Sequence, residues 1–338
     1  MSNDKPILTV TELKKYFPVR GGILNREVAQ VQAVDGVSFD VQPGETLGIV
    51  GESGCGKSTT AKLLMRLIEP DSGSMALGGE MIGPGGMALR DMRRRMQMVF
   101  QDSYASLNPR LTIEDTIAFA PKVHGISATE AKDRARDLLG KVGLDPNLFI
   151  RRYPHELSGG QRQRINIARA LALEPEVVIL DEAVSALDKS VEAQVLNLLS
   201  DLKKEFGLTY VFISHDLHVV HYISDRVLVM YLGEVVEIGP VDDIYARPAH
   251  PYTQALLSAM PSMDPDRRAT APPITGDPPN PINPPSGCRF HTRCPHAEEI
   301  CALKSPTLRR LSSGGGHFTA CHMAEPQSGH SAAPAEAA

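Results

Sequence analysis

The stretch "TLGIVGESGCGKSTTAKLLMRLI", residues 46–68, joins an apolar run to a glycine-rich loop and then to a segment with helical apolar spacing. Its loop, residues 51–59, fits the pattern G-x-x-x-x-G-K-[ST] and lies between a strand-like and a helix-like segment. Backbone N–H groups of such a loop, together with the positive end of the helix that follows, bind phosphate groups. The stretch therefore predicts a phosphate-binding loop in an α/β core.

Side chains of the loop have separate expected roles. We expect Lys57 to contact the β- and γ-phosphates of a nucleotide and the Ser58 hydroxyl to ligate Mg²⁺. We interpret Cys55 as a small filler, because only backbone is needed at its position. The expected nucleotide-binding residues of the loop are Gly51, Ser53, Gly54, Cys55, Gly56, Lys57, Ser58 and Thr59.

Composition narrows the class of protein. The 338 residues can form one large core or two moderate ones. A formal net charge of −5 argues against a general nucleic-acid binder, which would present a basic face. No signal-peptide pattern opens the sequence, and the apolar runs are far shorter than the roughly 20 residues that cross a bilayer. We expect a cytosolic chain whose membrane role, if any, comes through partners.

The order of apolar and polar segments predicts the topology. Short β-like runs over residues 7–50 indicate an antiparallel entry sheet, and residues 105–157 are polar and compatible with helices. The apolar runs "EVVILDE" (176–182) and "TYVFISHD" (209–216) each follow a helical segment, which is typical of a parallel sheet with crossover helices. Beyond residue 262 the chain is rich in proline, which predicts an extended linker.

Two carboxylates end the first of these runs. Asp181 and Glu182 would be costly at the end of a buried strand unless they met a cation or water. We expect Asp181 to hold Mg²⁺ through its water shell and Glu182 to polarise the attacking water. His215 ends the second run, where it can reach the γ-phosphate. Its neighbours Ser214 and Asp216 cannot complete a hydrolase triad with it, because adjacent residues point in alternating directions.

The segment "LSGGQRQR", residues 157–164, places a serine and two glycines before a long helix. This makes a second helix N-terminus able to bind an anion, so one chain offers two half-sites. Here the sequence resembles the ATP-binding subunits of ATP-binding-cassette (ABC) transporters, over nearly its whole length and with six motifs in the family order. The resemblance implies that the signature loop of one subunit, residues Ser158, Gly159, Gly160 and Gln161, closes over ATP held by another subunit.

The resemblance also implies roles for single residues. Phe17 would stack on adenine, with Tyr16 as a less favoured substitute. Gln101 would contact Mg²⁺ and the attacking water, Asp188 of "SALD" would lie at the dimer interface, and His215 would act as the switch histidine.

One position departs from the family pattern. Ala183 stands where the family usually has proline after the catalytic glutamate. Proline would restrict Glu182 toward extended backbone angles, so we expect alanine to loosen this base slightly while hydrolysis survives.

The implied fold is a P-loop NTPase ABC ATPase core with an antiparallel β subdomain, a helical subdomain at about residues 102–156 and a small cysteine-containing C-terminal extension. The expected domains are a nucleotide-binding domain at 1–261, a C-terminal region with a proline-rich linker at 262–325, and a disordered tail at 326–338. Residues 245–261 and 278–297 resemble the extension of oligopeptide and dipeptide importer ATPases. Short peptides are therefore the favoured solute, with nickel or another small solute, and a non-transport ABC ATPase, as alternatives.

The resemblance implies partners as well. We expect a heterodimer with a second ABC ATPase, two membrane permeases and an external substrate-binding protein, at the cytoplasmic face of the inner membrane and without nucleic acid. The helical subdomain would pass motion to the permeases, and residues 103–109 would form part of the docking groove.

Four cysteines gather near the end of the chain, Cys288, Cys294, Cys301 and Cys321, and histidines 291, 296, 317 and 322 lie close by in sequence. Four thiolates could hold Zn²⁺ or a 4Fe-4S iron–sulfur cluster. The spacing lacks the close C-x-x-C pairs usual for zinc, and the resemblance to importer subunits that carry an iron–sulfur cluster in this region favours the cluster. Zn²⁺ and metal-free thiols stay as alternatives, and disulfides are disfavoured in the cytosol.

Overall fold

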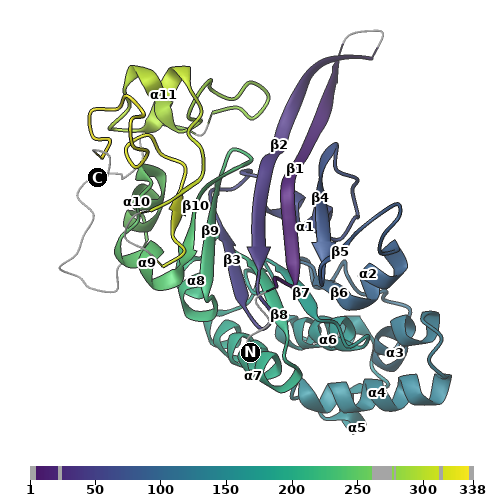
Figure 1. The fold of residues 1–338 in the computed structure, drawn as a ribbon. Helices are drawn as coiled ribbons and strands as arrows, with labels where there is room; N and C mark the ends of the chain where they lie inside the picture. Colours follow the sequence, from purple (N-terminus) through teal and green to yellow (C-terminus); the bar gives the residue numbers. More distant parts are fainter. Residues whose placement is uncertain (1–4, 22–24, 261–275, 278, 312–314, 335–338) are drawn as a thin grey trace. The chain divides into compact units, whose positions relative to one another are not determined.

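The phosphate-loop stretch forms strand β3 (Thr46–Val50), a loop and helix α1 (Lys57–Leu64) in the computed structural model (Figure 1). The structure describes residues 5–21, 25–260, 276–277, 279–311 and 315–334. Most of the proline-rich linker (261–275) and residues 335–338 of the predicted disordered tail lie outside the described residues. Within the described ranges no helix is long and apolar enough to span a bilayer.

The chain divides into two units. The phosphate-loop unit comprises residues 9–40, 47–75 and 215–338, and the helical unit comprises residues 1–8, 41–46 and 76–214. The sequence order of the elements interleaves the two units, so neither is a continuous piece of chain.

In the phosphate-loop unit, a run of neighbouring strands extends from β3 to the C-terminal extension. Strand β3 pairs in parallel with β9 (Arg226–Tyr231), and β9 pairs antiparallel with β10 (Glu234–Pro240). Strand β10 then pairs with β12 (Phe318–Thr319), which pairs with β11 (Arg309–Arg310). The other elements of this unit are β1 (Leu8–Gly21), β2 (Arg26–Val41), most of β4 (Ser72–Leu77), α8 (Leu217–Ile223), α9 (Val241–Ala246), α10 (Pro251–Ser258), η2 (His291–Arg293) and α11 (Glu299–Leu303).

In the helical unit, β6 (Met96–Val99), β7 (Val177–Asp181) and β8 (Thr209–Ile213) lie in parallel, with β7 in the middle. Helix α6 (Gly159–Leu171) precedes β7, and α7 (Lys189–Phe206) connects β7 to β8. The predicted α/β class, with parallel strands separated by helices, is confirmed. The remaining elements are β5 (Glu80–Met81), α2 (Leu89–Arg95), α3 (Ile113–Val123), α4 (Ala128–Lys141), α5 (Pro146–Phe149) and η1 (Pro154–Glu156).

Helices α3 and α4 pack against each other and against α6 (Figure 1). Each has a side-chain cap at its start: the Thr112 hydroxyl accepts from the Asp115 N–H, and the Ser127 hydroxyl accepts from the Glu130 N–H. The polar faces of these helices carry the charges that made the segment look exposed in the sequence, while residues such as Ala131 and Ala135 are buried.

A buried carboxylate anchors the C-terminal extension to β10. Glu237 has no exposed surface, and it accepts hydrogen bonds from the N–H groups of Ala249 and His250 at 2.7 and 3.1 Å. Its Oε1 also lies 2.7 Å from His317 Nε2 of the extension. In the segment for which the sequence predicts disorder, His330 is buried and Ser331 donates to Glu298.

His250 generates a pH-dependent stability. Its imidazole is 1% exposed, its Nδ1 accepts from the Tyr252 N–H at 3.0 Å, and burial lowers its pKa to about 4. The unfolded chain, with an ordinary histidine pKa of 6.5, then binds a proton that the folded chain does not. The contribution of His250 to the free energy of unfolding is fully present above pH 6.5. It is lost as the pH falls toward 4, by up to about 3 kcal/mol.

We expect His250→Asn, which keeps a capping oxygen but does not titrate, to flatten this dependence. Urea unfolding of the full chain between pH 7 and pH 4.5 measures the slope, and His155→Gln, which removes an exposed imidazole, is the control. An unchanged slope in His250→Asn would contradict the assignment.

Candidate nucleotide site

Two glycines let the phosphate loop lie against neighbouring backbone. A Cβ at Gly51 (φ 149°) would lie 2.2 Å from the Met230 carbonyl oxygen of β9, and one at Gly56 (φ 109°) would lie 2.2 Å from the Ala33 carbonyl oxygen of β2. Neither position accepts a side chain, so both glycines are required. Helix α1 starts directly after Gly56 without a side-chain cap, and the N-terminus of a helix is a favourable place for an anion.

Lys57 crosses the loop. Its ammonium donates to the carbonyl oxygens of Gly51 at 2.7 Å and Glu52 at 3.0 Å, and the residue is 5% exposed. Burial raises the pKa of the Cys55 thiol, which keeps it protonated at neutral pH. The Cys55 side chain thus fills space, as the sequence suggested, while its carbonyl oxygen accepts from the Gly233 N–H at 2.9 Å.

The carboxylate pair follows β7 in the helical unit. Asp181 is 4% exposed, and Glu182 is only partly buried. The Gln101 amide donates from Nε2 to Glu182 Oε2 at 2.7 Å, which brings together two of the predicted catalytic side chains. The bond fixes one oxygen of the expected base.

The backbone of Glu182 is left-handed, with φ 48°, a conformation that costs a non-glycine residue of the order of 1 kcal/mol. Its N–H donates to the Ile213 carbonyl of β8 at 2.9 Å, and its own carbonyl accepts from the Ser185 hydroxyl. Ala183 behind it is buried. The expected loosening of the base is a prediction about dynamics, but in this structure hydrogen bonds with Gln101, Ser185 and Ile213 hold Glu182.

The signature loop caps α6. The Ser158 hydroxyl accepts from the Gln161 N–H at 3.3 Å, and the Gln161 side chain accepts from the Ser158 N–H at 3.0 Å, which is a capping box. A Cβ at Gly160 would lie 2.4 Å from Val191 on α7, so this turn of α6 packs closely on its neighbour. Ser158 and Gly159 remain exposed at the helix N-terminus.

The structure describes every residue for which the family resemblance implies a role. Phe17 on β1 is 37% exposed, with the Lys15 ammonium 5.7 Å from its ring centroid, whereas the Tyr16 hydroxyl donates to Asp35. Asp188 is exposed and immediately precedes α7, and His215 is exposed after β8. Phe17, the phosphate loop and His215 belong to the phosphate-loop unit, and Gln101, Asp181, Glu182, Asp188 and the signature loop belong to the helical unit.

The predicted iron–sulfur cluster is wrong. Within the described ranges, which include all four cysteines, no group of three or more histidine, cysteine, aspartate or glutamate side chains is placed to hold a metal ion. Cys288, Cys294, Cys301 and Cys321 are free thiols around a cavity of about 20 Å³, room for roughly one water molecule.

The fold defines the surroundings of these side chains. Burial raises the pKa of Cys288 to about 12 and that of Cys321 to about 11, so both side chains are neutral thiols at neutral pH. The neighbouring histidines bond to the protein: His322 Nε2 lies 2.8 Å from the Lys304 carbonyl, and His317 Nε2 bonds Glu237. Sequence spacing gave the number of sulfur atoms but not the hydrogen-bond partners of the histidines around them.

Some residues that support the site do not belong to any motif of the sequence. Asn166 on α6 is fully buried and donates to the Ser103 carbonyl at 3.1 Å, and Arg169 donates to the Ser106 carbonyl. Polar side chains on the apolar face of a helix were the available signal. The phosphate loop is also contacted by Arg293 of the extension, through Glu52.

Comparisons with known proteins show the family of this chain. Residues 34–185 match the family model described as ABC transporter, and residues 236–301 match the one described as oligopeptide/dipeptide transporter, C-terminal region. The oligopeptide transport ATP-binding protein AppF of Bacillus subtilis is 50% identical over 95% of this chain and 98% of its own length. The di/tripeptide transport ATP-binding protein DppF of Pseudomonas aeruginosa is 48% identical over 94% of this chain and 98% of its own.

Solved structures share the fold. The cbiO1 protein from Clostridium perfringens, part of the ABC transporter complex cbiONQ, is 27% identical with a TM-score of 0.62 over 72% of this chain and 92% of its own. The ATP-binding cassette MJ0796, solved as a dimer in a post-hydrolysis state with ADP and phosphate, is 26% identical with a TM-score of 0.59 over 69% of this chain and 98% of its own. The chain belongs to the family of ATP-binding subunits of ABC transporters, which hydrolyse ATP, and it carries the C-terminal region of the oligopeptide/dipeptide transporters.

Proposed function

We propose that this chain hydrolyses ATP to drive the import of short peptides, from the cytoplasmic face of the membrane. The observation that carries the proposal is the match of residues 236–301, outside the ATPase core, to the oligopeptide/dipeptide transporter region. Relatives named for oligopeptide and for di/tripeptide transport span at least 94% of the chain. We take residues 1–261 as the nucleotide-binding domain and residues 262–325 as the C-terminal region.

Side chains on the two units supply the chemistry. The buried carboxylate of Asp181 and the Ser58 hydroxyl at the start of α1 are oxygen ligands of the kind that Mg²⁺ prefers. When bound, this ion offsets charge on the phosphate oxygens. Lys57 contributes a fixed positive charge to the phosphate loop. Glu182 accepts the proton of the attacking water, while the Gln101 amide holds its carboxylate in position.

A second subunit completes each site in this proposal. The N-terminus of α6, with Ser158 and Gly159, is exposed. Besides forming the capping box within its own chain, such a helix N-terminus can bind an anion. We assign it to the ATP held by a second, similar ATPase, with Asp188 at the shared interface. The dimer of MJ0796 supports two-subunit assembly in a related cassette. Phe17 would stack on adenine and His215 would contact the γ-phosphate.

Helix α6 also links the signature loop to the permeases. Its residues Asn166 and Arg169 hold residues 103–106, and the Arg162 guanidinium lies 5.2 Å from the Tyr104 ring centroid. A movement of α6 therefore moves this loop with it. We assign residues 103–109 to docking on two membrane permeases, which receive the solute from an external binding protein.

Glu182→Gln should reduce ATP hydrolysis by the assembled transporter at least about 10²-fold and leave ATP binding intact, because the amide keeps the shape but cannot accept the proton. Phosphate release and binding of a non-hydrolysable ATP analogue measure the two properties. Glu205→Gln, an exposed glutamate on α7, is the matched control and should hydrolyse ATP normally. Full hydrolysis by Glu182→Gln would remove this residue from the base role.

The identity of the transported solute can be tested separately from ATP hydrolysis. We expect the reconstituted complex to accumulate di- to oligopeptides in proteoliposomes, and Glu182→Gln in this chain to stop that uptake. Uptake of labelled Ni²⁺ with no uptake of peptide would replace the peptide assignment with the nickel alternative and leave the ATPase assignment untouched.

A further inference from the structure

The phosphate loop is bound by an arginine from the far end of the chain. Arg293 Nη1 donates to Glu52 Oε2 at 2.8 Å, and Nη2 donates to Glu52 Oε1 at 3.1 Å. The arrangement is bidentate, the form of ion pair with the best-defined geometry. The Arg293 side chain is 6% exposed and that of Glu52 is 24% exposed, so water screens the pair weakly.

Two tyrosines form hydrogen bonds with the partners of this ion pair. The Glu52 N–H donates to the Tyr252 hydroxyl of α10 at 2.8 Å, and Arg293 Nη1 lies 3.3 Å from the Tyr231 hydroxyl of β9. The rings of Tyr231 and Tyr252 lie 4.6 Å apart and both contact Phe290 of the extension. Since the Glu52 N–H is used within the protein, this residue contributes structure to the loop and not a phosphate contact.

Glu52 connects the arginine to the phosphate-binding lysine. Its carbonyl oxygen accepts from Lys57 Nζ at 3.0 Å, while its carboxylate binds Arg293. Glu52 is also the one carboxylate in residues 51–59, a loop that must hold polyphosphate. Without Arg293 its negative charge would be unpaired beside the phosphates and would repel them.

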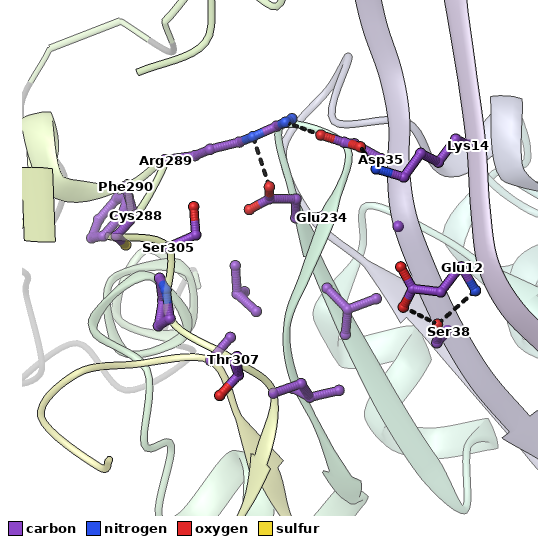
Figure 2. Close-up of a pocket in the computed structure, with 16 residues that line it drawn as sticks. Glu12, Lys14, Asp35, Ser38, Glu234, Cys288, Arg289, Phe290, Ser305 and Thr307 are labelled. Atoms are coloured by element: carbon purple, nitrogen blue, oxygen red, sulfur yellow. Dashed lines mark hydrogen bonds and ion pairs between the residues drawn. The ribbon is translucent and has the colours of Figure 1, made fainter. Parts of the chain in front are cut away.

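A second arginine of the extension holds the turn behind the loop. Arg289 donates to the Leu232 carbonyl and pairs with Asp35 and with Glu234, the latter at 2.9 Å (Figure 2). Gly233, the residue after Leu232, donates its N–H to the Cys55 carbonyl of the phosphate loop. Arg289 and Arg293 therefore support the loop at two different points.

We propose that Arg293 is a positioning residue for ATP, acting through Glu52, and that the C-terminal extension is a working part of the nucleotide site. Arg293 holds the backbone of Glu52 that orients Lys57, and it cancels the one negative charge of the loop. The inference rests on ATP binding by residues 51–59 and does not depend on which solute is transported.

The test compares four full-length variants for binding of a non-hydrolysable ATP analogue with Mg²⁺. We expect Arg293→Gln to weaken binding about tenfold and Arg293→Lys to weaken it less, because lysine keeps the charge but not the bidentate geometry. Glu52→Gln/Arg293→Gln should recover much of the affinity, because it removes the unpaired carboxylate. Arg310→Gln, an exposed arginine on β11, is the matched control.

The remaining outcomes separate this proposal from simpler explanations. In the assembled transporter, Arg293→Gln should raise KM for ATP with little change in kcat, as loss of uniform binding requires. Wild-type affinity in Arg293→Gln overturns the proposal. So does a loss that persists in the double variant together with a lowered Tm, since that result describes a purely structural arginine. Absence of binding by the wild-type chain would instead contradict the assigned function.

Discussion

Close approach of backbone to backbone at the two ends of the phosphate loop is the constraint on which the nucleotide site depends. Gly51 lies against the Met230 carbonyl and Gly56 against the Ala33 carbonyl, so the loop is pressed onto β9 and β2 with no room for a side chain. Helix α1 begins directly after Gly56, so these contacts also set the position of its N-terminus. The loop geometry is set by its neighbours as much as by its own sequence.

Much of this arrangement could be predicted from local patterns. The run 46–68 encodes its strand, loop and helix contiguously, and the parallel strands β7 and β8 follow from apolar runs that each come after a helical segment. The capping box at Ser158 and Gln161 is likewise a short-range signal. What could not be predicted is any contact whose partners are distant in sequence, such as Arg293 with Glu52, because no periodicity records it.

The cysteines show where local reasoning fails. Their number and spacing are compatible with a metal site, but ligation depends on the three-dimensional arrangement of the ligands, which the spacing does not give. In the folded chain the four thiols lie around a small cavity, and burial raises the pKa of Cys288, Cys294 and Cys321. The same segment carries Arg289 and Arg293 between its cysteines, and neither arginine belongs to a motif that would predict its partner.

The energetics of the Arg293–Glu52 pair explain why the extension and the loop must be considered together. Removing one partner of a mostly buried ion pair costs roughly 3–5 kcal/mol because it leaves a desolvated charge, whereas replacing both partners with matched neutral groups can cost little. In this chain the carboxylate of Glu52 is paired because the extension supplies the guanidinium of Arg293. The region that matches the oligopeptide/dipeptide transporters and the phosphate loop are therefore joined by one charge pair, so a change of charge at either residue leaves the other without its partner.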